Sequence, residues 1–300
     1  MRGRSPGRSW VRVTRGAHRL PTASGLAAWQ LVLPRDAAFT HLTAAALYGW
    51  WLPPLPADLP VFADVPQAGG RLRRPGIRVT RVGTPVSWRW LDSVRVADPA
   101  ATLLACARDL GTLDLVVLAD AALHAGSCTL DEVAEQATAR RRGAPRLRRA
   151  LALTDARSES PWESLLRVLH VTCGIDVVPQ HPVIDADGRQ VARADLWLVG
   201  SRVLHEYDGA VHRDPAAHAR DLRRDRALLT AGWTRRGYVA DDVVARSVAV
   251  LRDADSTVGR DHRPERIRPW LRLLAGSLVT PSGQATLRTR LELDVNRRAR

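Results

Sequence analysis

The stretch Arg193-Ala-Asp-Leu-Trp-Leu-Val-Gly-Ser-Arg-Val-Leu-His-Glu-Tyr-Asp208 contains two short apolar segments on either side of Gly200-Ser201. A glycine followed by a serine suits a two-residue hairpin turn that has glycine at its first central position. If the chain turns there, the two segments become neighbouring antiparallel strands, and their register sets Asp195 directly opposite Glu206. The sequence therefore predicts a β-hairpin that brings two carboxylates together.

The same register places a third carboxylate beside this pair. Side chains alternate between the two faces of a strand, so Asp195, Glu206 and Asp208 all emerge on one face, with Arg193 opposite Asp208. Directly opposed side chains lie about 5 Å apart, and like charges at that distance destabilise a sheet. Three carboxylates in such proximity need a cation or a shared proton. A hard divalent metal ion is the first candidate, because it prefers oxygen ligands.

Length and charge predict two domains and a polyanionic partner. The chain has 300 residues, 45% of them hydrophobic, which exceeds the usual size of one domain and is enough to bury real cores. Its net charge is +14. The sequence contains 45 arginines and no lysine, and the arginine side chain suits phosphate contacts. A basic protein favours nucleic acid as a partner. The alternative is an ordinary protein of a basic proteome.

The cysteines and the apolar runs indicate a cytoplasmic protein. Cys106, Cys128 and Cys173 are scattered without the spacing of a metal site, which suggests reduced, mostly buried thiols. No apolar run approaches the length of a membrane span. The arginine-rich N-terminal segment lacks the apolar core of a signal peptide.

Apolar periodicity and turn residues predict an α/β fold. The second half follows the order α-β-β-β-α-β-α, and a polar segment at 155–161 separates it from the first half. Within that segment Ser160-Pro161 is a typical helix start. The first half, with fewer strands and several helices, is predicted to be a smaller α+β domain. The second-half elements are helices 162–171, 215–230 and 241–251 and strands 177–183, 191–199, 202–208 and 233–239. The first-half elements are helices 39–51, 98–110, 113–125 and 130–139 and strands 61–65 and 77–82.

The second half resembles a known family of nucleases. A helix, a three-stranded meander, a helix and a strand make up the core of the PD-(D/E)xK, or restriction-endonuclease-like, fold. More closely, the chain is similar to the domain of unknown function related to very-short-patch-repair endonucleases. The resemblance covers residues 158–252 and depends on an ordered set of short motifs. These motifs are Glu163-Ser164, Asp195-Leu-Trp197, Glu206-Tyr207-Asp208-Gly209, His212, Asp221, Arg224-Asp225, Leu228 and Gly232-Trp233.

The first half resembles the antitoxin-type regulators of abortive-infection systems, the AbiEi family. The matching stretches are Thr40-His-Leu-Thr-Ala-Ala-Ala-Leu-Tyr-Gly49 and Val96-Ala-Asp-Pro-Ala-Ala-Thr-Leu-Leu104. Those regulators usually begin with a winged helix-turn-helix, which is expected to be short or absent here, because the residues before His41 lack a clear pair of helices. The resemblances imply an AbiEi-like domain at 1–154, an endonuclease-like domain at 158–252 and a charged, less regular extension at 253–300. They also imply a toxin or another defence-system component as a partner.

The nuclease resemblance implies metal-dependent hydrolysis of DNA in a defence or repair setting. The three carboxylates of the hairpin would bind Mg²⁺, for which Mn²⁺ can substitute, and Glu163 would complete or orient the metal's shell. The metal would lower the pKa of a bound water and neutralise charge on the phosphodiester. A histidine could shuttle the proton, and His212 is favoured because strand alternation points His205 to the other face. The arginines expected to hold the nucleic-acid backbone are Arg193, Arg220, Arg223 and Arg224.

Two positions depart from the nuclease pattern. The motif lysine would stand two residues after Glu206, where this chain has Asp208. Arg193 could partly replace the missing charge, although arginine is a poor general base because it does not deprotonate. The family's last strand usually carries an arginine four residues after the tryptophan, and that position is Gly237 here, directly after Arg235-Arg236.

Each predicted role has a structural alternative. Salt bridges from Arg193 and Arg167 could hold the acidic cluster, and Glu163 could pair with Arg167 at i, i+4 spacing. His212 could be an ordinary turn residue, His41 could cap or pack, and the arginines of the 215–230 helix could form a solvated face. A rival function is a non-catalytic, antitoxin-like DNA-binding regulator that keeps the nuclease fold as a scaffold. A third is a protein-interaction module of a defence locus.

Overall fold

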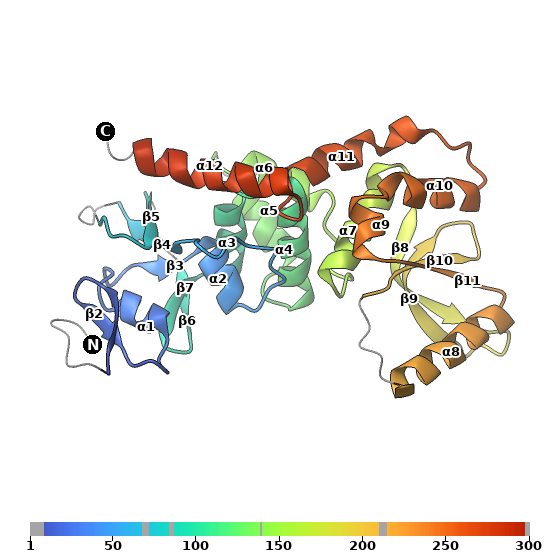
Figure 1. The fold of residues 1–300 in the computed structure, drawn as a ribbon, viewed down its shortest axis with the longest axis horizontal. Helices are drawn as coiled ribbons and strands as arrows, with labels where there is room; N and C mark the ends of the chain where they lie inside the picture. The colour runs from blue at the N-terminus through green and yellow to red at the C-terminus, as the bar shows by residue number, and fades with distance from the viewer. Residues whose placement is uncertain (1–8, 68–71, 84–86, 139, 210–214, 298–300) are drawn as a thin grey trace. The chain divides into compact units, whose positions relative to one another are not determined.

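The computed structural model describes residues 9–67, 72–83, 87–138, 140–209 and 215–297. These residues form a mixed α/β protein with helices α1 to α12 and three sheets (Figure 1). The chain divides into two compact units. The first unit consists of Met1–Asp109 and Gly126–Arg148, and the second unit consists of Leu110–Ala125 and Arg149–Arg300. Among the described helices, none combines the length and the apolar character needed to cross a bilayer.

A five-stranded sheet forms the centre of the first unit, with the strand order β5-β4-β3-β7-β6. The short antiparallel hairpin β1-β2 is a separate sheet. Trp29, Phe39 and Val96 are among the buried side chains of this unit's core. The strands are β1 (Val11–Thr14), β2 (Ala17–Arg19), β3 (Ala38–Phe39), β4 (Val61–Pro66), β5 (Ile77–Val82), β6 (Trp88–Leu91) and β7 (Val94–Ala97).

The helix predicted at 39–51 is shorter in the structure, because Phe39 pairs with β4 as part of β3 and a glycine with φ +71°, Gly49, follows the helix end. His41 begins this helix with a left-handed φ of +56° and is buried. Its ring stacks on Phe62 at 4.4 Å, and its Nε2 lies 3.2 Å from Asp109 Oδ2. His41 therefore packs in the interior. The helices are α1 (Gly25–Gln30), α2 (His41–Leu47), α3 (Pro99–Cys106), α5 (Leu130–Thr138) and α6 (Ala144–Leu151), the last of which crosses the boundary between the units.

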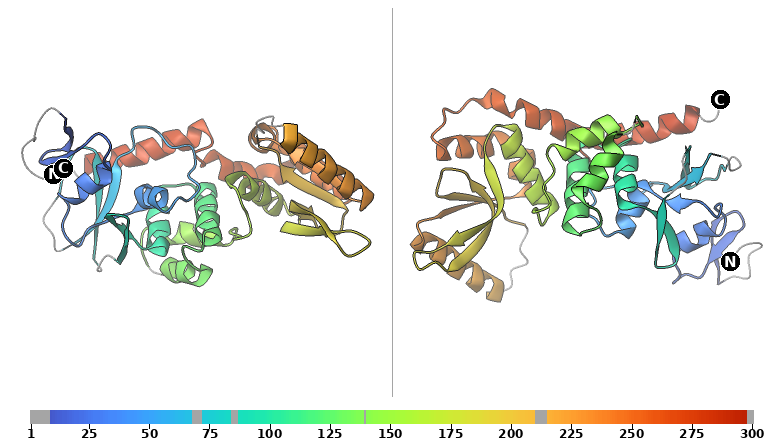
Figure 2. Two further views of the ribbon diagram at one scale, coloured as in Figure 1. Left: turned by 90° about the horizontal axis from the view of Figure 1, so that it is seen from below. Right: turned by 180° about the vertical axis from the view of Figure 1, so that it is seen from behind.

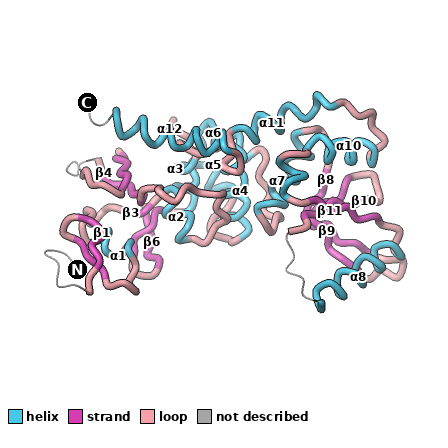
Figure 3. Tube along the Cα trace, in the orientation of Figure 1, coloured by secondary structure: helices cyan, strands magenta, loops and turns pink. Residues whose placement is uncertain are grey.

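A four-stranded sheet with the order β11-β10-β9-β8 forms the centre of the second unit (Figure 3). Strands β8, β9 and β10 are an antiparallel meander, whereas β11 runs parallel to β10. Parallel neighbours need a crossover connection, which α8 supplies. The predicted order α-β-β-β-α-β is confirmed, and two helices follow β11 where one was expected. The elements are α7 (Pro161–Thr172), β8 (Val177–Ile184), β9 (Gln190–Leu198), β10 (Val203–Tyr207), α8 (Pro215–Thr230), β11 (Thr234–Tyr238), α9 (Ala240–Val244) and α10 (Ser247–Thr257).

Helices α7 and α8 contact opposite faces of this sheet, which Figure 2 shows from two further sides. His205 of β10 hydrogen-bonds to His170 of α7, with 2.9 Å between the ring nitrogens. The next residue, Glu206, is bonded by Arg224 of α8. Because successive strand residues point to opposite faces, the two helices are on different sides. The prediction that His205 faces away from the carboxylates is confirmed.

The start of α7 is fixed by a cap that was visible in the sequence. The Ser160 hydroxyl accepts a hydrogen bond from the backbone N–H of Glu163 at 3.2 Å, and Pro161 occupies the first turn. This cap satisfies an N–H that would otherwise have no partner in the helix. It therefore sets where Glu163 stands relative to the sheet.

Two parts of the second unit differ from the predicted domain boundaries. Helix α4 (Thr112–His124), expected in the 1–154 domain, belongs to the second unit, where Asp120 pairs with Arg167 of α7 at 2.7 Å. The tail that begins at residue 253, expected as a less regular extension, is largely helical up to residue 297 and belongs to the same unit. Asp114 of α4 accepts bonds from the Ser277 hydroxyl and the Leu278 N–H, which attaches the tail. The tail's elements are η1 (Pro264–Ile267), α11 (Arg268–Ala275) and α12 (Pro281–Arg297).

Candidate functional site

The β9–β10 hairpin has the predicted register. Leu204 pairs with Trp197 and His205 with Leu196, so the next step along the strands sets Glu206 opposite Asp195. The backbone N–H of Tyr207 donates to Asp195 Oδ2 at 2.9 Å, which holds this carboxylate at the edge of β10. The two acidic side chains are thus neighbours on adjacent strands, as the sequence predicts.

The turn itself is longer than the predicted two-residue turn, since the strands end at Leu198 and resume at Val203. The Ser201 N–H donates to Leu198 O at 3.1 Å, and Gly200 has a φ of +82°. The Ser201 carbonyl accepts a hydrogen bond from Trp197 Nε1 at 2.9 Å, so Ser201 bonds to a side chain and does not pair with the facing strand. The strand register is nevertheless the predicted one, because the longer loop is still centred on Gly200-Ser201.

Two arginines neutralise Glu206. Arg224 of α8 donates Nη1 to Glu206 Oε2 at 3.0 Å and Nη2 to Oε1, and it also donates to the Arg193 carbonyl at 2.8 Å. Arg235 of β11 donates Nε to the same Oε2 at 2.5 Å. Only 4% of the Glu206 side chain is exposed, so these bonds replace the water that the carboxylate has lost. The cation that the acidic cluster requires is thus supplied, in part, by the chain.

Asp208 is held by the same strand, β11. Arg235 Nη2 bridges to Asp208 Oδ1, and the carboxylate lies over Gly237, where a Cβ atom would overlap it. Burial raises the pKa of Asp208, and the charge of Arg235 opposes that rise. The side chain of Arg193, the residue predicted opposite Asp208, pairs with Glu159 at 2.7 Å. The basic partner of Asp208 therefore comes from the following strand and not from the hairpin.

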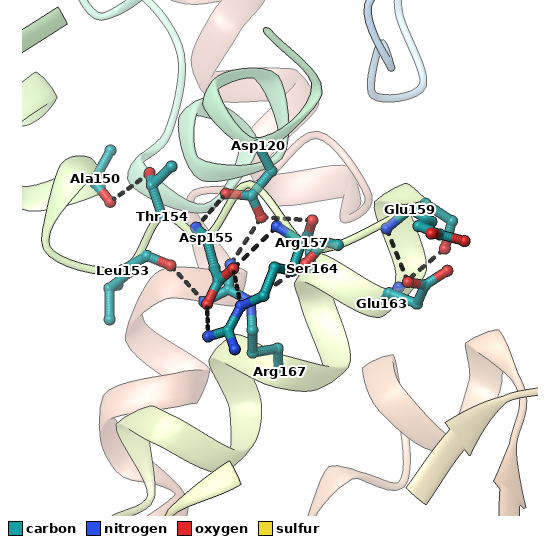
Figure 4. A network of polar contacts seen from close by, with 12 residues as sticks. Asp120, Ala150, Leu153, Thr154, Asp155, Arg157, Glu159, Glu163, Ser164 and Arg167 are labelled. Atoms are coloured by element: carbon teal, nitrogen blue, oxygen red, sulfur yellow. Dashed lines mark hydrogen bonds and ion pairs between the residues drawn. The ribbon is translucent and has the colours of Figure 1, made fainter. Parts of the chain in front are cut away.

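Glu163 lies at the start of α7 and accepts two hydrogen bonds, of which Figure 4 shows the one from Glu159. Its Oε2 receives the backbone N–H of Glu159 at 2.8 Å and the side-chain amide of Gln180 at 2.7 Å. Gln180 is a β8 residue with a left-handed φ of +52°, and the β8–β9 register sets it opposite Asp195. Glu163, Gln180 and Asp195 thus form one polar group next to Glu206.

The salt bridge proposed between Glu163 and Arg167 does not form. Arg167 is directed to Asp120, and Ser164 donates to the same Asp120 oxygen at 2.6 Å (Figure 4). Arg167 also donates to the Leu153 carbonyl at 2.6 Å. Arg167 is therefore part of the interior support of α7, and the charges that hold the acidic cluster come from Arg224 and Arg235.

Asp195 is the carboxylate most perturbed by this environment. Burial raises its pKa to about 7, and the nearby carboxylates of Glu163 and Glu206 add to the rise. The Tyr207 N–H and the charge of Arg224 act in the opposite direction. A carboxyl group with this pKa is partly protonated at neutral pH, so a proton relieves the remaining repulsion. A carboxyl poised near neutrality is also a common feature of sites that transfer protons or bind cations.

A chain of neutral histidines supports the other face of β10. His170 donates Nδ1–H to the Leu166 carbonyl at 2.7 Å, so its Nε2 is the acceptor for His205 Nδ1–H. The ring of His205 also contacts Tyr238 of β11. Burial lowers the pKa of His170 to about 4 and that of His205 to about 2. These neutral rings fix β10 against α7 directly behind Glu206.

Three predicted site residues lie partly or wholly outside this cluster. His212 falls outside the described residues. Arg220 belongs to α8, but its side chain is not described. Arg223 is exposed on α8, and Arg224 is the helix residue that reaches the acids. Gln180 and Arg235 were not predicted as site residues. For Arg235 the sequence held a signal, because it precedes Gly237 by two residues and so shares its face of the strand.

Comparison with known proteins identifies relatives in Mycobacterium tuberculosis. The uncharacterized protein Rv2248 of strain ATCC 25618 / H37Rv is 32% identical over 215 residues, which cover 67% of this chain and 73% of the relative. The uncharacterized protein MT2308 of strain CDC 1551 / Oshkosh matches to the same extent. This chain belongs to the family of these two proteins. No family model and no solved structure matches the chain.

The acidic site of this family member offers oxygen donors of the kind that Mg²⁺ binds. No group of three or more His, Cys, Asp or Glu side chains is arranged as a metal site within the described part of the chain. Mg²⁺, however, takes one or two protein carboxylates and fills its shell with water and phosphate. The opposed pair Asp195 and Glu206 fits that requirement, and their mutual repulsion is what a cation would relieve.

Proposed function

We propose that the second unit is an endonuclease-like domain that binds DNA and hydrolyses its phosphodiester bonds with Mg²⁺. The observation that carries the proposal is the opposed pair Asp195 and Glu206, with Glu163 close enough to raise the pKa of Asp195. Burying carboxylates costs free energy that a paired arginine, a proton or a bound cation must offset. Among the ion pairs of the described residues, the arginines of this cluster contact Glu206 and Asp208 but not Asp195.

The topology of the second unit supports the proposal. An antiparallel meander followed by a crossover helix and a parallel strand is the arrangement expected of the PD-(D/E)xK core and of the domain related to very-short-patch-repair endonucleases. The paired acids stand on the second and third strands of that meander, where the resemblance predicts them. The protein's net charge of +14 supports a nucleic-acid substrate.

Asp195 and Glu206 would hold the metal, with Asp208 nearby. When bound, Mg²⁺ supplies a water of lowered pKa and stabilises negative charge on the phosphate. Other residues of the chain orient the acids of the site. The Tyr207 N–H holds one oxygen of Asp195, and the Gln180 side-chain amide holds the neighbouring Glu163. The nuclease motif has a lysine close to these acids, and in this chain Arg235 supplies a permanent positive charge beside Glu206. Unlike a lysine, Arg235 cannot act as a base, because it does not deprotonate.

A second candidate is a DNA-binding regulator without hydrolytic activity, located in the cytoplasm and associated with a toxin or another defence component. The observation that favours it is the double engagement of Glu206 by Arg224 and Arg235, which already neutralises the carboxylate. The similarity of the first half to AbiEi regulators supports the same alternative. In this case the nuclease-like fold would serve as a scaffold for DNA.

The decisive experiment compares cleavage and binding in one set of variants. The full chain is incubated with supercoiled plasmid and labelled duplex in Mg²⁺, Mn²⁺ or EDTA, and DNA binding is measured in parallel. We expect Asp195→Asn to abolish metal-dependent cleavage and to retain binding, whereas Asp187→Asn, an exposed aspartate of the β8–β9 turn, should leave both unchanged. Metal-independent binding without cleavage in the unmodified chain would support the regulator instead.

A further inference from the structure

The two arginines that bond to Glu206 are held in different ways. Arg235 extends from β11, the strand paired with β10, and bridges Glu206 and Asp208. Arg224 extends from α8 and, among the described residues, bonds to Glu206 and to the Arg193 carbonyl. Its side chain is 33% exposed, so solvent reaches it although Glu206 is buried. Arg235 therefore bridges two acids and Arg224 holds one, although the Arg235 side chain, at 26%, is nearly as exposed.

We infer that Arg224 is a phosphate-binding residue which, without DNA, occupies the cation position on Glu206. The inference rests on the proposed function of this site. Arg224 grips both Glu206 oxygens in a fork, and the same planar fork matches two oxygens of a phosphodiester. A DNA phosphate that draws Arg224 away frees the side of Glu206 that this guanidinium covers.

This exchange makes metal binding depend on DNA. While Arg224 holds Glu206, a divalent cation must compete with a guanidinium for the same oxygens. When a phosphate takes Arg224, that competitor is removed and the phosphate also offers oxygen ligands to the cation. Metal and DNA both favour the state in which the Arg224–Glu206 contact is open. Such coupling is reciprocal, so bound metal in turn raises the affinity for DNA. The device would keep the acids inactive until substrate is in place.

The test measures Mn²⁺ binding and duplex binding by the full-length protein, and the inference predicts that one substitution changes the two affinities in opposite directions. Mn²⁺ binding without DNA is followed by the EPR signal of free Mn²⁺, and metal-free binding of a labelled duplex is followed in EDTA at fixed ionic strength. We expect Arg224→Met to bind Mn²⁺ about tenfold more tightly than the unmodified chain, within the usual range of coupling, and to bind duplex more weakly. A variant that merely loosened the fold would weaken both.

The matched control is Arg223→Met, which removes the same charge from an exposed position on the same helix. It should leave Mn²⁺ affinity unchanged and weaken duplex binding no more than one phosphate contact would. Thermal melts of both variants check that they fold. Equal Mn²⁺ affinity of the Arg224→Met and Arg223→Met variants overturns the inference, as does tight Mn²⁺ binding by the unmodified chain. If either outcome is found and Asp195→Asn loses Mn²⁺ binding, the nuclease proposal still stands. If neither the unmodified chain nor any variant binds Mn²⁺, the inference and the nuclease proposal are both overturned.

Discussion

Replacing Arg167 by methionine tests how the second unit supports the start of α7. The Arg167 side chain is 5% exposed and its partner Asp120 is fully buried. Arg167 bonds to Asp120 at 2.7 Å, to the Leu153 carbonyl at 2.6 Å and to Ser158 Oγ at 3.3 Å (Figure 4). The substitution keeps an apolar stem of similar length and removes every one of these bonds. Asp120 is then left with the Ser164 hydroxyl and the Asp155 N–H.

The expected loss follows from leaving a buried carboxylate without its cation. Removing one partner of a buried ion pair destabilises a protein by about 3–5 kcal/mol. The two remaining hydrogen bonds to Asp120 favour the lower end, so we expect about 3 kcal/mol at pH 7.5. Burial already raises the pKa of Asp120 to about 6, and loss of Arg167 raises it further. At pH 5 Asp120 is then neutral, and the loss should fall to about 1–2 kcal/mol, the cost of the other unmade bonds.

Urea denaturation of the unmodified chain and the Arg167→Met variant, followed by far-UV circular dichroism at both pH values, measures these differences. The double variant Arg167→Met with Asp120→Leu removes the orphaned charge as well, so it should be more stable than the single variant at pH 7.5. Ser282→Ala, a change at an exposed position in the same unit, is the control and should stay within about 0.5 kcal/mol. A pH-independent loss, or a double variant weaker than the single one, would refute the assignment of the cost to buried charge.

Three further predictions concern the acidic site. Because the folded state raises the pKa of Asp195 from 3.8 to about 7, its ionisation opposes folding; the urea midpoint of the unmodified chain should fall between pH 4 and pH 7 by more than that of Asp195→Asn. Gly237→Ala places a Cβ against the Asp208 carboxylate, so it should destabilise the chain by about 1–3 kcal/mol, and combining it with Asp208→Ala should recover most of that loss in the same denaturation assay. His205 is neutral because burial lowers its pKa, so its C2 proton resonance should not titrate between pH 5 and pH 8, and a midpoint near 6.5 would contradict this.

The hairpin was predictable because all of its determinants are local. The apolar segments flank one glycine, and alternation then fixes which side chains share a face, so the opposition of Asp195 and Glu206 and the reversed direction of His205 follow from sequence. The turn differed from the prediction, since Ser201 bonds to the Trp197 side chain, yet the register did not change. Strand pairing over short loops is therefore the part of this fold that sequence specifies best.

The place of α4 in the second unit was not predictable from local sequence, because its buried aspartates bond to distant residues. Asp120 and Arg167 are 47 positions apart, and Asp114 and Ser277 are 163 apart. Each pair contains a carboxylate on α4, which periodicity alone identifies as an ordinary apolar helix of the first half. No local pattern shows which distant hydroxyl or guanidinium satisfies a buried aspartate. The same limit explains why Arg235 was not assigned to Glu206 and Asp208, although its strand was predicted correctly.

The identity of the counter-charge is what separates the two candidate functions. The acidic cluster is neutralised by Arg235 and Arg224, and by a proton in the fraction of molecules in which Asp195 is protonated. Stability alone does not account for this arrangement, because apolar side chains can often replace a buried ion pair without loss. Of the three charges, Arg235 bridges two acids, but the proton can leave near neutral pH and Arg224 can move to a phosphate. The metal-dependent proposal requires that the proton and Arg224 leave when metal and DNA bind, whereas the regulator requires only that both arginines stay on Glu206.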